Sequence, residues 1–351
     1  MRNENITPAR IVVAGAGLIG RAHIERIVAE PQATLAGIVD ISPATEQHAA
    51  ALGVPYSADL EALLREAKPD GVIIALPNQA HFTAGMAAIK ARVAVLMEKP
   101  VCETVAQALE LADAADAETV PVLVGHHRRH SAIIRHAKQI LTSGRLGHLI
   151  AVNALCWWRK PDSYFEGPNV WRRQPGGGPV LINLIHAIDD LRNLCGEIES
   201  VQALTSNQTR GFQVEDTAAV LLRFANGALG TLTLSDAAPS PWSWELTSGE
   251  NPAYPRTQQP CYFLAGSQAS LSLPQLELWH HPNEGHWFTP IESRPNPTPD
   301  EDPLANQIRH FCDVATRRAQ PLLDARGGAK TLHATLAVLE SASTGNPVRL
   351  L

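Results

Sequence analysis

Hydrophobic and polar positions divide the chain into two parts of different texture. Up to about residue 125, short apolar runs alternate with stretches in which apolar residues recur at helical spacing. The runs occupy residues 10–15, 34–40, 71–76, 93–98 and 120–125. Runs of this length separated by amphipathic helices are typical of βαβ units, which build a parallel sheet with helices on both faces. We therefore predict a doubly wound Rossmann sheet, with ligands at the carboxyl ends of its strands.

Beyond residue 125 the pattern changes to that of an α+β domain. Residues 217–235 alternate apolar and polar side chains on either side of Asn226 and Gly227, which predicts two antiparallel strands joined by a hairpin turn. Two helices are expected near the end, at about residues 304–318 and 328–343. The second part is therefore predicted to hold a large, mostly antiparallel sheet.

Length and composition support two domains and exclude some functions. A chain of 351 residues exceeds the usual limit of one hydrophobic core, so we expect two domains, a Rossmann domain at 1–125 and an α+β domain at 126–351. The net charge of -6 argues against nucleic-acid binding. The five cysteines are scattered and never spaced as CxxC, so no disulfide framework or thiolate zinc site is expected.

No targeting or membrane segment is expected either. The first ten residues lack an apolar signal-peptide core, and no run approaches the roughly 18 apolar residues of a membrane helix. We therefore expect a cytoplasmic protein with no membrane partner and no nucleic-acid partner.

A glycine motif follows the first apolar run. Gly15, Gly17 and Gly20 have the GxGxxG spacing that gives a tight turn, close approach to a pyrophosphate and tight helix packing. Asp40 ends the next strand, where a carboxylate accepts hydrogen bonds from the adenosine ribose and repels a 2′-phosphate. We predict NAD as cofactor, with NADP also open. The motif residues expected to contact it are Gly15, Gly17, Leu18, Ile19, Gly20 and Asp40.

Two further strand ends carry polar residues. Pro77, Asn78 and His81 follow the run at 71–76, Glu98 ends the run at 93–98, and Lys99 follows it directly. Carboxyl ends of neighbouring parallel strands share one edge of the sheet, so all five are expected to line the cofactor site.

Three glycines at 176–178 precede a helix that carries an asparagine and a histidine. At about 100° per residue, Asn183, His186 and Asp190 fall within about 60° of one another, apart from a broad apolar face. The glycines are expected to let the backbone approach substrate or cofactor closely, or to act as a hinge. Histidine is suited to proton transfer because its pKa lies near neutrality.

Taken together, these motifs resemble the glucose-fructose oxidoreductase, inositol dehydrogenase and MocA family, called Gfo/Idh/MocA. The resemblance rests on "VVAGAGLIG", Asp40, "ALPNQAH", "MEKP", "GHHRRH" and the segment from the triple glycine to His186. It implies NAD(P)-dependent hydride transfer at a secondary alcohol or ketone of a sugar, cyclitol or sugar acid. It also implies that Lys99 binds the reacting hydroxyl and His186 serves as acid/base, and an alternative makes Lys99 the base.

The chain departs from the family pattern at one position. Many members carry an aspartate four residues before the histidine, where this chain has Ile182. Isoleucine cannot orient an imidazole, whereas Asp190 at i+4 or Asn183 at i-3 can, so we expect the orienting role to have moved. The loss also leaves open a dinucleotide-binding sensor or scaffold without turnover. A dihydrodiol dehydrogenase of the same family is a further alternative.

Other residues are predicted to shape the substrate site. "GHHRRH" is expected to give a basic wall, and Trp171 offers an aromatic face for a sugar ring beside the guanidinium of Arg172. No metal site is expected. The resemblance implies that the Rossmann domain at 1–125 binds NAD(P) and that the α+β domain at 126–351 serves substrate binding and oligomerisation. The expected assembly is a homodimer or homotetramer formed through the sheet of the second domain. The predicted substrate-binding residues are Lys99, His127, Arg128, Trp171, Arg172, Asn183 and His186.

Overall fold

The computed structural model describes residues 7–283 and 285–350, so the expectation for the first ten residues falls mostly outside the described part. The chain forms two compact units. One comprises Met1–His130 with Pro303–Leu332, and the other comprises Ser131–Asp302 with His333–Leu351. This division differs from the expected contiguous domains, because a C-terminal segment returns to the first unit.

A six-stranded parallel sheet with the order β3-β2-β1-β4-β5-β6 organises the first unit. Its strands are β1 (Ala9–Ala14), β2 (Ala33–Val39), β3 (Tyr56–Ser57), β4 (Gly71–Ile74), β5 (Ala94–Met97) and β6 (Val122–Val124). The direction of the order reverses between β1 and β4, which is the place where doubly wound sheets bind ligands. The predicted Rossmann sheet is confirmed.

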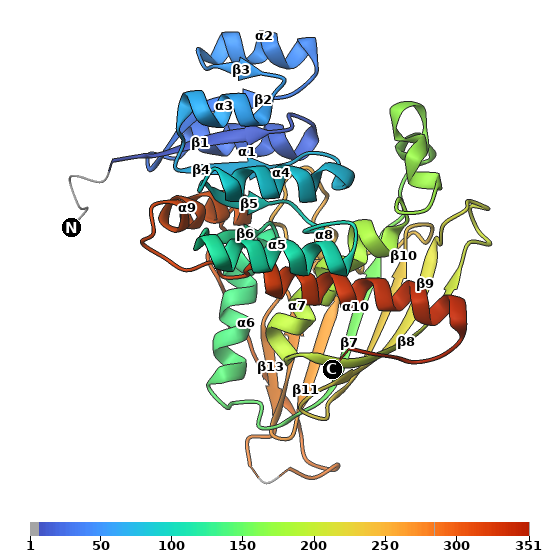
Figure 1. Cartoon of the computed structure of the whole chain (residues 1–351). Coiled ribbons are helices and arrows are strands. Elements are labelled where there is room, and N and C mark those ends of the chain that lie inside the picture. Colours follow the sequence, from blue (N-terminus) through green and yellow to red (C-terminus); the bar gives the residue numbers. More distant parts are fainter. Residues whose placement is uncertain (1–6, 284, 351) are drawn as a thin grey trace. The chain divides into compact units, whose positions relative to one another are not determined.

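Helices cover both faces of this sheet, and Figure 1 shows α3, α4 and α5 stacked along one side. The helices of the unit are α1 (Leu18–Ala29), α2 (Pro43–Leu52), α3 (Leu60–Ala67), α4 (Asn78–Lys90), α5 (Val105–Glu118), the short η1 (His127–His130) and α9 (Pro303–Ala315). Thr104 caps α5 by accepting a hydrogen bond from the N–H of Gln107. On α9, Phe311 is fully buried and shares a core with Ile11 and Ile73. The C-terminal segment therefore completes the core of the first unit.

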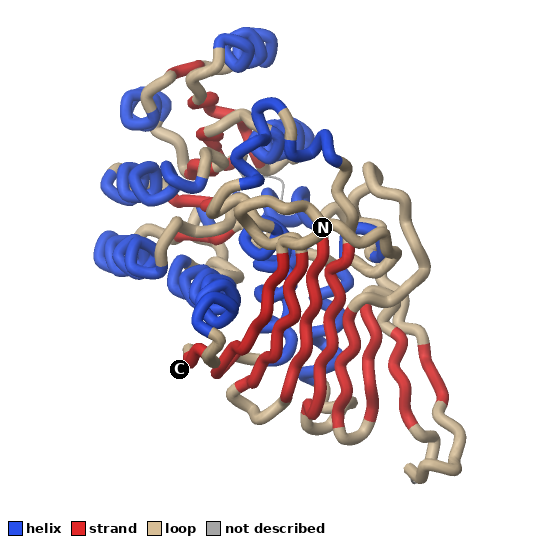
Figure 2. The backbone as a smooth tube through the Cα atoms, turned by 90° about the vertical axis from the view of Figure 1, so that its right-hand side faces the viewer, coloured by secondary structure: helices blue, strands red, loops and turns tan. Residues whose placement is uncertain are grey.

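A nine-stranded sheet organises the second unit, with the order β14-β13-β12-β11-β7-β10-β9-β8-β15. Figure 2 shows its strands in red, lying side by side. Its strands are β7 (Leu149–Trp157), β8 (Ile198–Ser206), β9 (Thr217–Phe224), β10 (Leu229–Ser235), β11 (Tyr262–Gly266), β12 (Ala269–Leu273), β13 (Glu277–His280), β14 (Glu292–Arg294) and β15 (Val348–Arg349). Neighbouring strands are antiparallel except β7 and β10, which run parallel. The predicted hairpin joins β9 and β10, and Gly227 takes a φ of 89° in its turn.

In the described part of the chain, the helices of this unit pack on one face of the sheet. The helical segments are α6 (Ala132–Thr142), η2 (Asp162–Phe165), η3 (Gly167–Arg173), the π-helical η4 (Val180–Leu184), α7 (Ile185–Cys195), α8 (Trp244–Thr247) and α10 (Ala325–Thr344), which crosses the boundary between the units. Residues of α6, α7 and the second half of α10 share one core with the covered face. On the other face Leu204 is 73% exposed, Leu221 55% and Leu229 53%. This open sheet face is therefore unusually apolar for a solvated surface.

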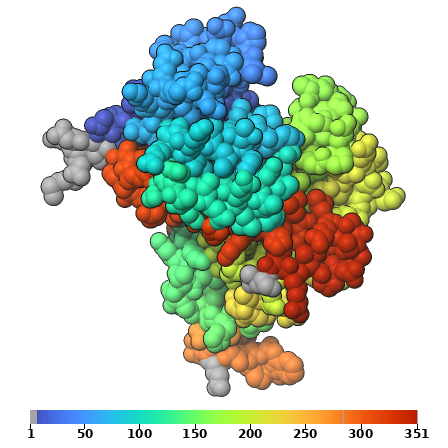
Figure 3. Space-filling model, viewed as in Figure 1, coloured from blue at the N-terminus to red at the C-terminus, as the bar shows by residue number. Residues whose placement is uncertain are grey.

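The loop between β13 and β14, in orange, stands at the surface of the second unit in Figure 3. All five cysteines are buried and free. Within residues 7–283 and 285–350, no helix combines the length and apolar character required to cross a membrane.

Candidate active site

In the glycine turn between β1 and α1, two glycines are required by packing and the third leaves space for a ligand. Gly15 has a φ of 93°, and a Cβ atom there would lie 2.4 Å from the carbonyl oxygen of Ala75. A Cβ atom on Gly20 would lie 1.8 Å from the carbonyl oxygen of Gly15. Gly17 is exposed, and a Cβ atom there would meet nothing within 4 Å. The first and third glycines are therefore required by the fold itself, whereas the second keeps open the space before the N-terminus of α1.

Asp40 follows β2 at the same edge of the sheet. Its Oδ2 accepts a hydrogen bond from the N–H of Ala16 at 2.7 Å, and its Oδ1 accepts one from the N–H of Ser42 at 2.8 Å. These bonds fix the carboxylate and leave each oxygen further acceptor capacity. Beside it, Ile41 is 88% exposed and offers an apolar surface. The turn, the carboxylate and the apolar neighbour fit a dinucleotide.

Glu98 connects the end of β5 to α1. Its Oε1 lies 2.7 Å from Nε2 of His23, which is fully buried, and its Oε2 accepts a hydrogen bond from the N–H of Lys99 at 3.2 Å. Burial raises the pKa of Glu98, but the hydrogen bond from His23 and the positive charge of Lys99 outweigh it, so the pKa lies below its usual range. Glu98 is therefore ionised at neutral pH, and it fixes the backbone that carries Lys99. The peptide bond between Lys99 and Pro100 is cis.

The structure corrects the prediction for His81. Its ring is completely buried, with Nδ1 2.8 Å from the carbonyl oxygen of Pro100 and Nε2 2.9 Å from that of Leu76. Because both ring nitrogens are occupied by backbone groups, neither is left to bind a cofactor. His81 instead links α4 to the turn after Lys99. Pro77 is exposed and Asn78 half-buried at the start of α4, so both remain open to a ligand.

The residues after β6 that were expected to form a basic wall, His127 and Arg128, present less positive charge than predicted. Burial, together with the charge of Arg128, lowers the pKa of His127 to about 3, so its imidazole is neutral at physiological pH. Arg128 itself is only 4% exposed. His127 therefore offers a neutral hydrogen-bonding group, and little of the Arg128 guanidinium is open to a substrate.

In the second unit, two of the three consecutive glycines are explained by close contacts within the protein. A Cβ atom on Gly177 would lie 2.5 Å from the carbonyl oxygen of Trp171, and one on Gly178 would lie 2.3 Å from Oε1 of Glu215. That same oxygen accepts a hydrogen bond from the N–H of Val180 at 2.9 Å. Gly178 therefore lets the Glu215 carboxylate reach the start of the helix that bears the predicted histidine.

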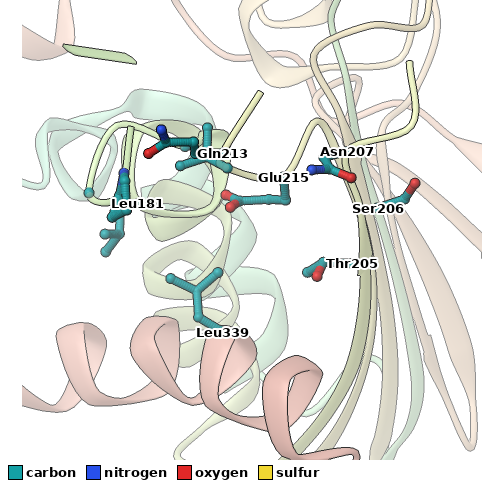
Figure 4. Close-up of a pocket in the computed structure, with 11 residues that line it drawn as sticks. Leu181, Thr205, Ser206, Asn207, Gln213, Glu215 and Leu339 are labelled. Atoms are coloured by element: carbon teal, nitrogen blue, oxygen red, sulfur yellow. The ribbon is translucent and has the colours of Figure 1, made fainter. Parts of the chain in front are cut away.

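A cavity of about 400 Å³ adjoins this loop. Figure 4 shows the Glu215 carboxylate between Leu181 on one side and the end of β8, marked by Thr205, on the other, with Leu339 below. Burial raises the pKa of Glu215, although the hydrogen bond from Val180 opposes the shift.

The helix that bears His186 does not start regularly. A π-helical turn at Val180–Leu184 precedes α7, so the angles expected at 100° per residue do not hold before Ile185. The Oδ1 atom of Asn183 accepts a hydrogen bond from Nζ of Lys160 at 2.5 Å, and Oδ2 of Asp190 accepts one from the hydroxyl of Tyr262 at 3.0 Å. Both side chains expected to orient His186 thus hold other partners, and their orienting role remains a prediction.

Lys160 is a candidate that the sequence analysis missed. Its side chain is 4% exposed and its Nζ lies 3.9 Å from Oδ2 of Asp236, in addition to the bond to Asn183. Burial lowers its pKa to about 8, against the opposing effect of Asp236. A buried lysine beside the helix of a predicted acid/base residue is a functional candidate. The sequence signal that indicates Lys160 is the Lys160-Pro161 pair after an apolar strand, which matches the Lys99-Pro100 pair.

The remaining predicted substrate residues lie on η3. Nη1 of Arg172 donates to the carbonyl oxygen of Tyr164 at 3.0 Å, and its guanidinium lies 3.9 Å from the centre of the Tyr164 ring. Arg172 therefore braces this segment, while Trp171 is 47% exposed. Lys99 belongs to the first unit, whereas Trp171, Arg172, Asn183 and His186 belong to the second.

The first unit therefore has the fold of an NAD-binding Rossmann domain. Residues 9–126 match the oxidoreductase family with an NAD-binding Rossmann fold, and residues 134–272 match the GFO/IDH/MocA C-terminal domain. The chain belongs to the Gfo/Idh/MocA family, which contains NAD(P)-dependent dehydrogenases and reductases of sugars and cyclitols.

Individual relatives are distant. The rhizopine catabolism protein MocA of Rhizobium meliloti is 27% identical over 67% of this chain and 73% of its own length. The inositol 2-dehydrogenase of Mycolicibacterium gilvum is 30% identical over 63% of each chain. Levoglucosan dehydrogenase, solved with NADH and levoglucosan, superimposes with a TM-score of 0.80 at 20% identity, covering 98% of this chain and 100% of its own. The last comparison supports the fold.

Proposed function

We propose that the protein transfers hydride between NAD and a secondary alcohol or ketone of a sugar, cyclitol or sugar acid. The observation that supports the proposal is that the candidate cofactor and reaction residues of the first unit lie along one edge of the parallel sheet. The open space at Gly17, the fixed carboxylate of Asp40 and the Lys99 backbone held by Glu98 all follow the carboxyl ends of strands there. Relatives named inositol 2-dehydrogenase and levoglucosan dehydrogenase support the substrate class.

The chain's own residues would hold the cofactor as follows. The N–H groups at the start of α1 bind the pyrophosphate, and Asp40 accepts hydrogen bonds from the adenosine ribose. Ile41 covers one face of the adenine. When bound, NAD supplies the hydride acceptor. Because a carboxylate at Asp40 repels a 2′-phosphate and no arginine follows it directly, we propose NAD rather than NADP as the preferred form.

Lys99 and His186 are proposed to handle the proton. The Lys99 ammonium donates a hydrogen bond to the reacting hydroxyl and stabilises negative charge on its oxygen as the proton leaves. The imidazole of His186 accepts that proton and returns it in the reverse direction.

The assignment is tested by pH-rate profiles of Lys99→Met and His186→Asn, with exposed Lys90→Met and His148→Asn as matched controls. We expect both site variants to lose at least about 100-fold in kcat and the controls to stay within twofold. The variant that abolishes the pH-dependent limb of the profile identifies the base. Near-normal turnover in both site variants would refute the assignment.

A sensor or scaffold without turnover is the second candidate, favoured by Ile182 in place of an aspartate. It predicts NADH binding, seen as a fluorescence change, without reduction of NAD by any member of a panel of polyols, cyclitols, sugar acids and dihydrodiols. Turnover on one panel member would exclude it.

We also propose that the open sheet face pairs with a second copy of the chain. Leu204, Leu221 and Leu229 give it an apolar surface that water would otherwise solvate. Light scattering is expected to give a dimeric or tetrameric mass, and Leu221→Glu is expected to shift it toward the monomer. A monomeric mass for the unmodified protein would contradict this proposal.

A further inference from the structure

A second cavity, of about 320 Å³, lies in the second unit and is rich in positive charge. Three arginines line it, Arg159, Arg173 and Arg210, with Asp162 as the one acidic residue of the lining. A net charge of -6 makes such a local excess of positive charge unexpected in this protein. Guanidinium groups brought around one cavity repel one another unless an anion lies between them.

Arg210 is held rigidly on one side. Its Nε donates to Oδ1 of Asp236 at 2.8 Å, and Nη2 donates to the carbonyl oxygen of Lys160 at 2.9 Å. The loop beneath it is also fixed, because the N–H groups of Thr209 and Arg210 both donate to Oδ2 of Asp216 at 2.9 Å. The guanidinium is therefore ordered before any ligand arrives, which reduces the entropic cost of binding.

The counter-ion inside the cavity is replaceable. Nη1 of Arg210 lies 3.5 Å from Oδ1 of Asp162, whose side chain is 85% exposed. An exposed carboxylate at this distance contributes little to stability and can move into water. An anionic ligand can therefore take its place on the same face of Arg210.

Arg159 and Arg173 have no such counter-ion. In the described part of the chain, neither forms an ion pair with a carboxylate. Nε of Arg173 is buried and has no hydrogen-bond partner, although its guanidinium lies 5.0 Å from the centre of the Phe212 ring. A buried N–H without an acceptor is costly, so Arg173, which lines the cavity, gains from an acceptor placed beside its guanidinium.

We propose that this cavity binds a carboxylate or phosphate group through Arg159, Arg173 and Arg210. Planar guanidinium groups suit both anions because each can donate two parallel hydrogen bonds. Lys160 connects this site to the predicted reaction residues. Its backbone carbonyl accepts a hydrogen bond from Arg210, and its side chain donates one to Asn183. The anion is therefore an acidic group of the substrate or a separate anionic ligand beside it.

The test measures binding of inorganic phosphate and of D-gluconate to the full-length protein by calorimetry, with D-glucose as the neutral comparison. Both anions are expected to bind and glucose to bind at least tenfold more weakly at this site. Arg173→Gln and Arg159→Gln are each expected to weaken anion binding at least tenfold. Exposed Arg145→Gln, which removes the same charge away from the cavity, is expected to stay within twofold.

Two results would overturn the proposal: no binding of either anion, or equal weakening by the cavity variants and by Arg145→Gln. Arg159 is exposed, so its variant keeps the test valid if Arg173→Gln fails to fold. If the anion belongs to the substrate, Arg159→Gln lowers kcat/KM for acidic sugars and spares neutral ones. If it is separate, phosphate alters turnover of a neutral sugar without competing with it. Binding is measured without turnover, so failure of the proposed enzyme activity leaves this result interpretable.

Discussion

Two alanine substitutions in the glycine turn are expected to have different consequences. In Gly20→Ala the new Cβ atom starts 1.8 Å from the carbonyl oxygen of Gly15, so the backbone of the turn must move by more than about 1 Å. Overpacking of this kind costs about 1–3 kcal/mol or more of unfolding free energy. In Gly17→Ala the Cβ atom meets nothing, and φ of -68° with ψ of -164° suits alanine. Its cost is limited to about 0.5–1 kcal/mol for a weaker helix N-cap.

Cofactor binding separates the two variants further. The alanine methyl of Gly17→Ala occupies the space assigned to the pyrophosphate, so the Kd for NADH should rise at least about tenfold, about 1.4 kcal/mol, in a protein that still folds. The assay combines thermal unfolding with a fluorescence titration of NADH. A Gly17→Ala protein that binds NADH within twofold of the parent would show that the pyrophosphate does not lie at this glycine. A Gly20→Ala protein of unchanged stability would show that the close contact is easily relieved.

The remaining predictions concern charge. Asp40→Asn should weaken NAD binding and raise the NADP-to-NAD ratio of kcat/KM about tenfold, unless the 2′-position is read elsewhere. Glu98 has a lowered folded-state pKa, so its stabilisation is present above pH 4.5 and is lost as the pH falls through the folded-state pKa. Glu98→Gln should therefore cost about 3 kcal/mol at pH 7 in denaturant unfolding, a gap that narrows below pH 4.5, whereas exposed Glu118→Gln should cost under about 1 kcal/mol. Lys160 has a pKa of about 8 in the folded protein, against the ordinary value of 10.5. Between these pH values the unfolded chain binds more protons than the folded protein, so the unfolding free energy rises with pH there. Lys160→Met should lack that rise, which is on the order of 3 kcal/mol, and an identical pH dependence in both proteins would contradict the burial argument.

Short-range features were the most predictable from the sequence. The turn at Asn226 and Gly227 and the glycine turn after β1 each depend on residues close together in the chain. In such cases backbone conformation follows from residue type, so the pattern predicts the structure directly.

Contacts between residues far apart in the chain were harder to predict from the sequence. The hydrogen bond between His23 and Glu98 joins residues 75 positions apart, and no local sequence pattern predicts it. The periodicity of α9 shows that one face is apolar, but not that Phe311 covers the sheet of the first unit. The π-helical turn before α7 also escaped prediction, because its sequence is compatible with a regular helix. For the site, the candidate residues were predictable, while the partners of Asn183 and Lys160 required the fold.

The return of α9 to the first unit affects how the protein is made. During synthesis, residues up to His130 leave the ribosome long before Pro303–Leu332 exist. Until Phe311 is translated, the apolar side chains of Ile11 and Ile73, which share its core, remain uncovered. In the folded protein the Phe311 ring packs closely on the sheet, since a Cβ atom added at Gly71 would lie only 2.8 Å from it. The part of the chain that emerges first is therefore among the last to reach its final packing, and a nascent chain halted near residue 300 exposes a surface that chaperones recognise.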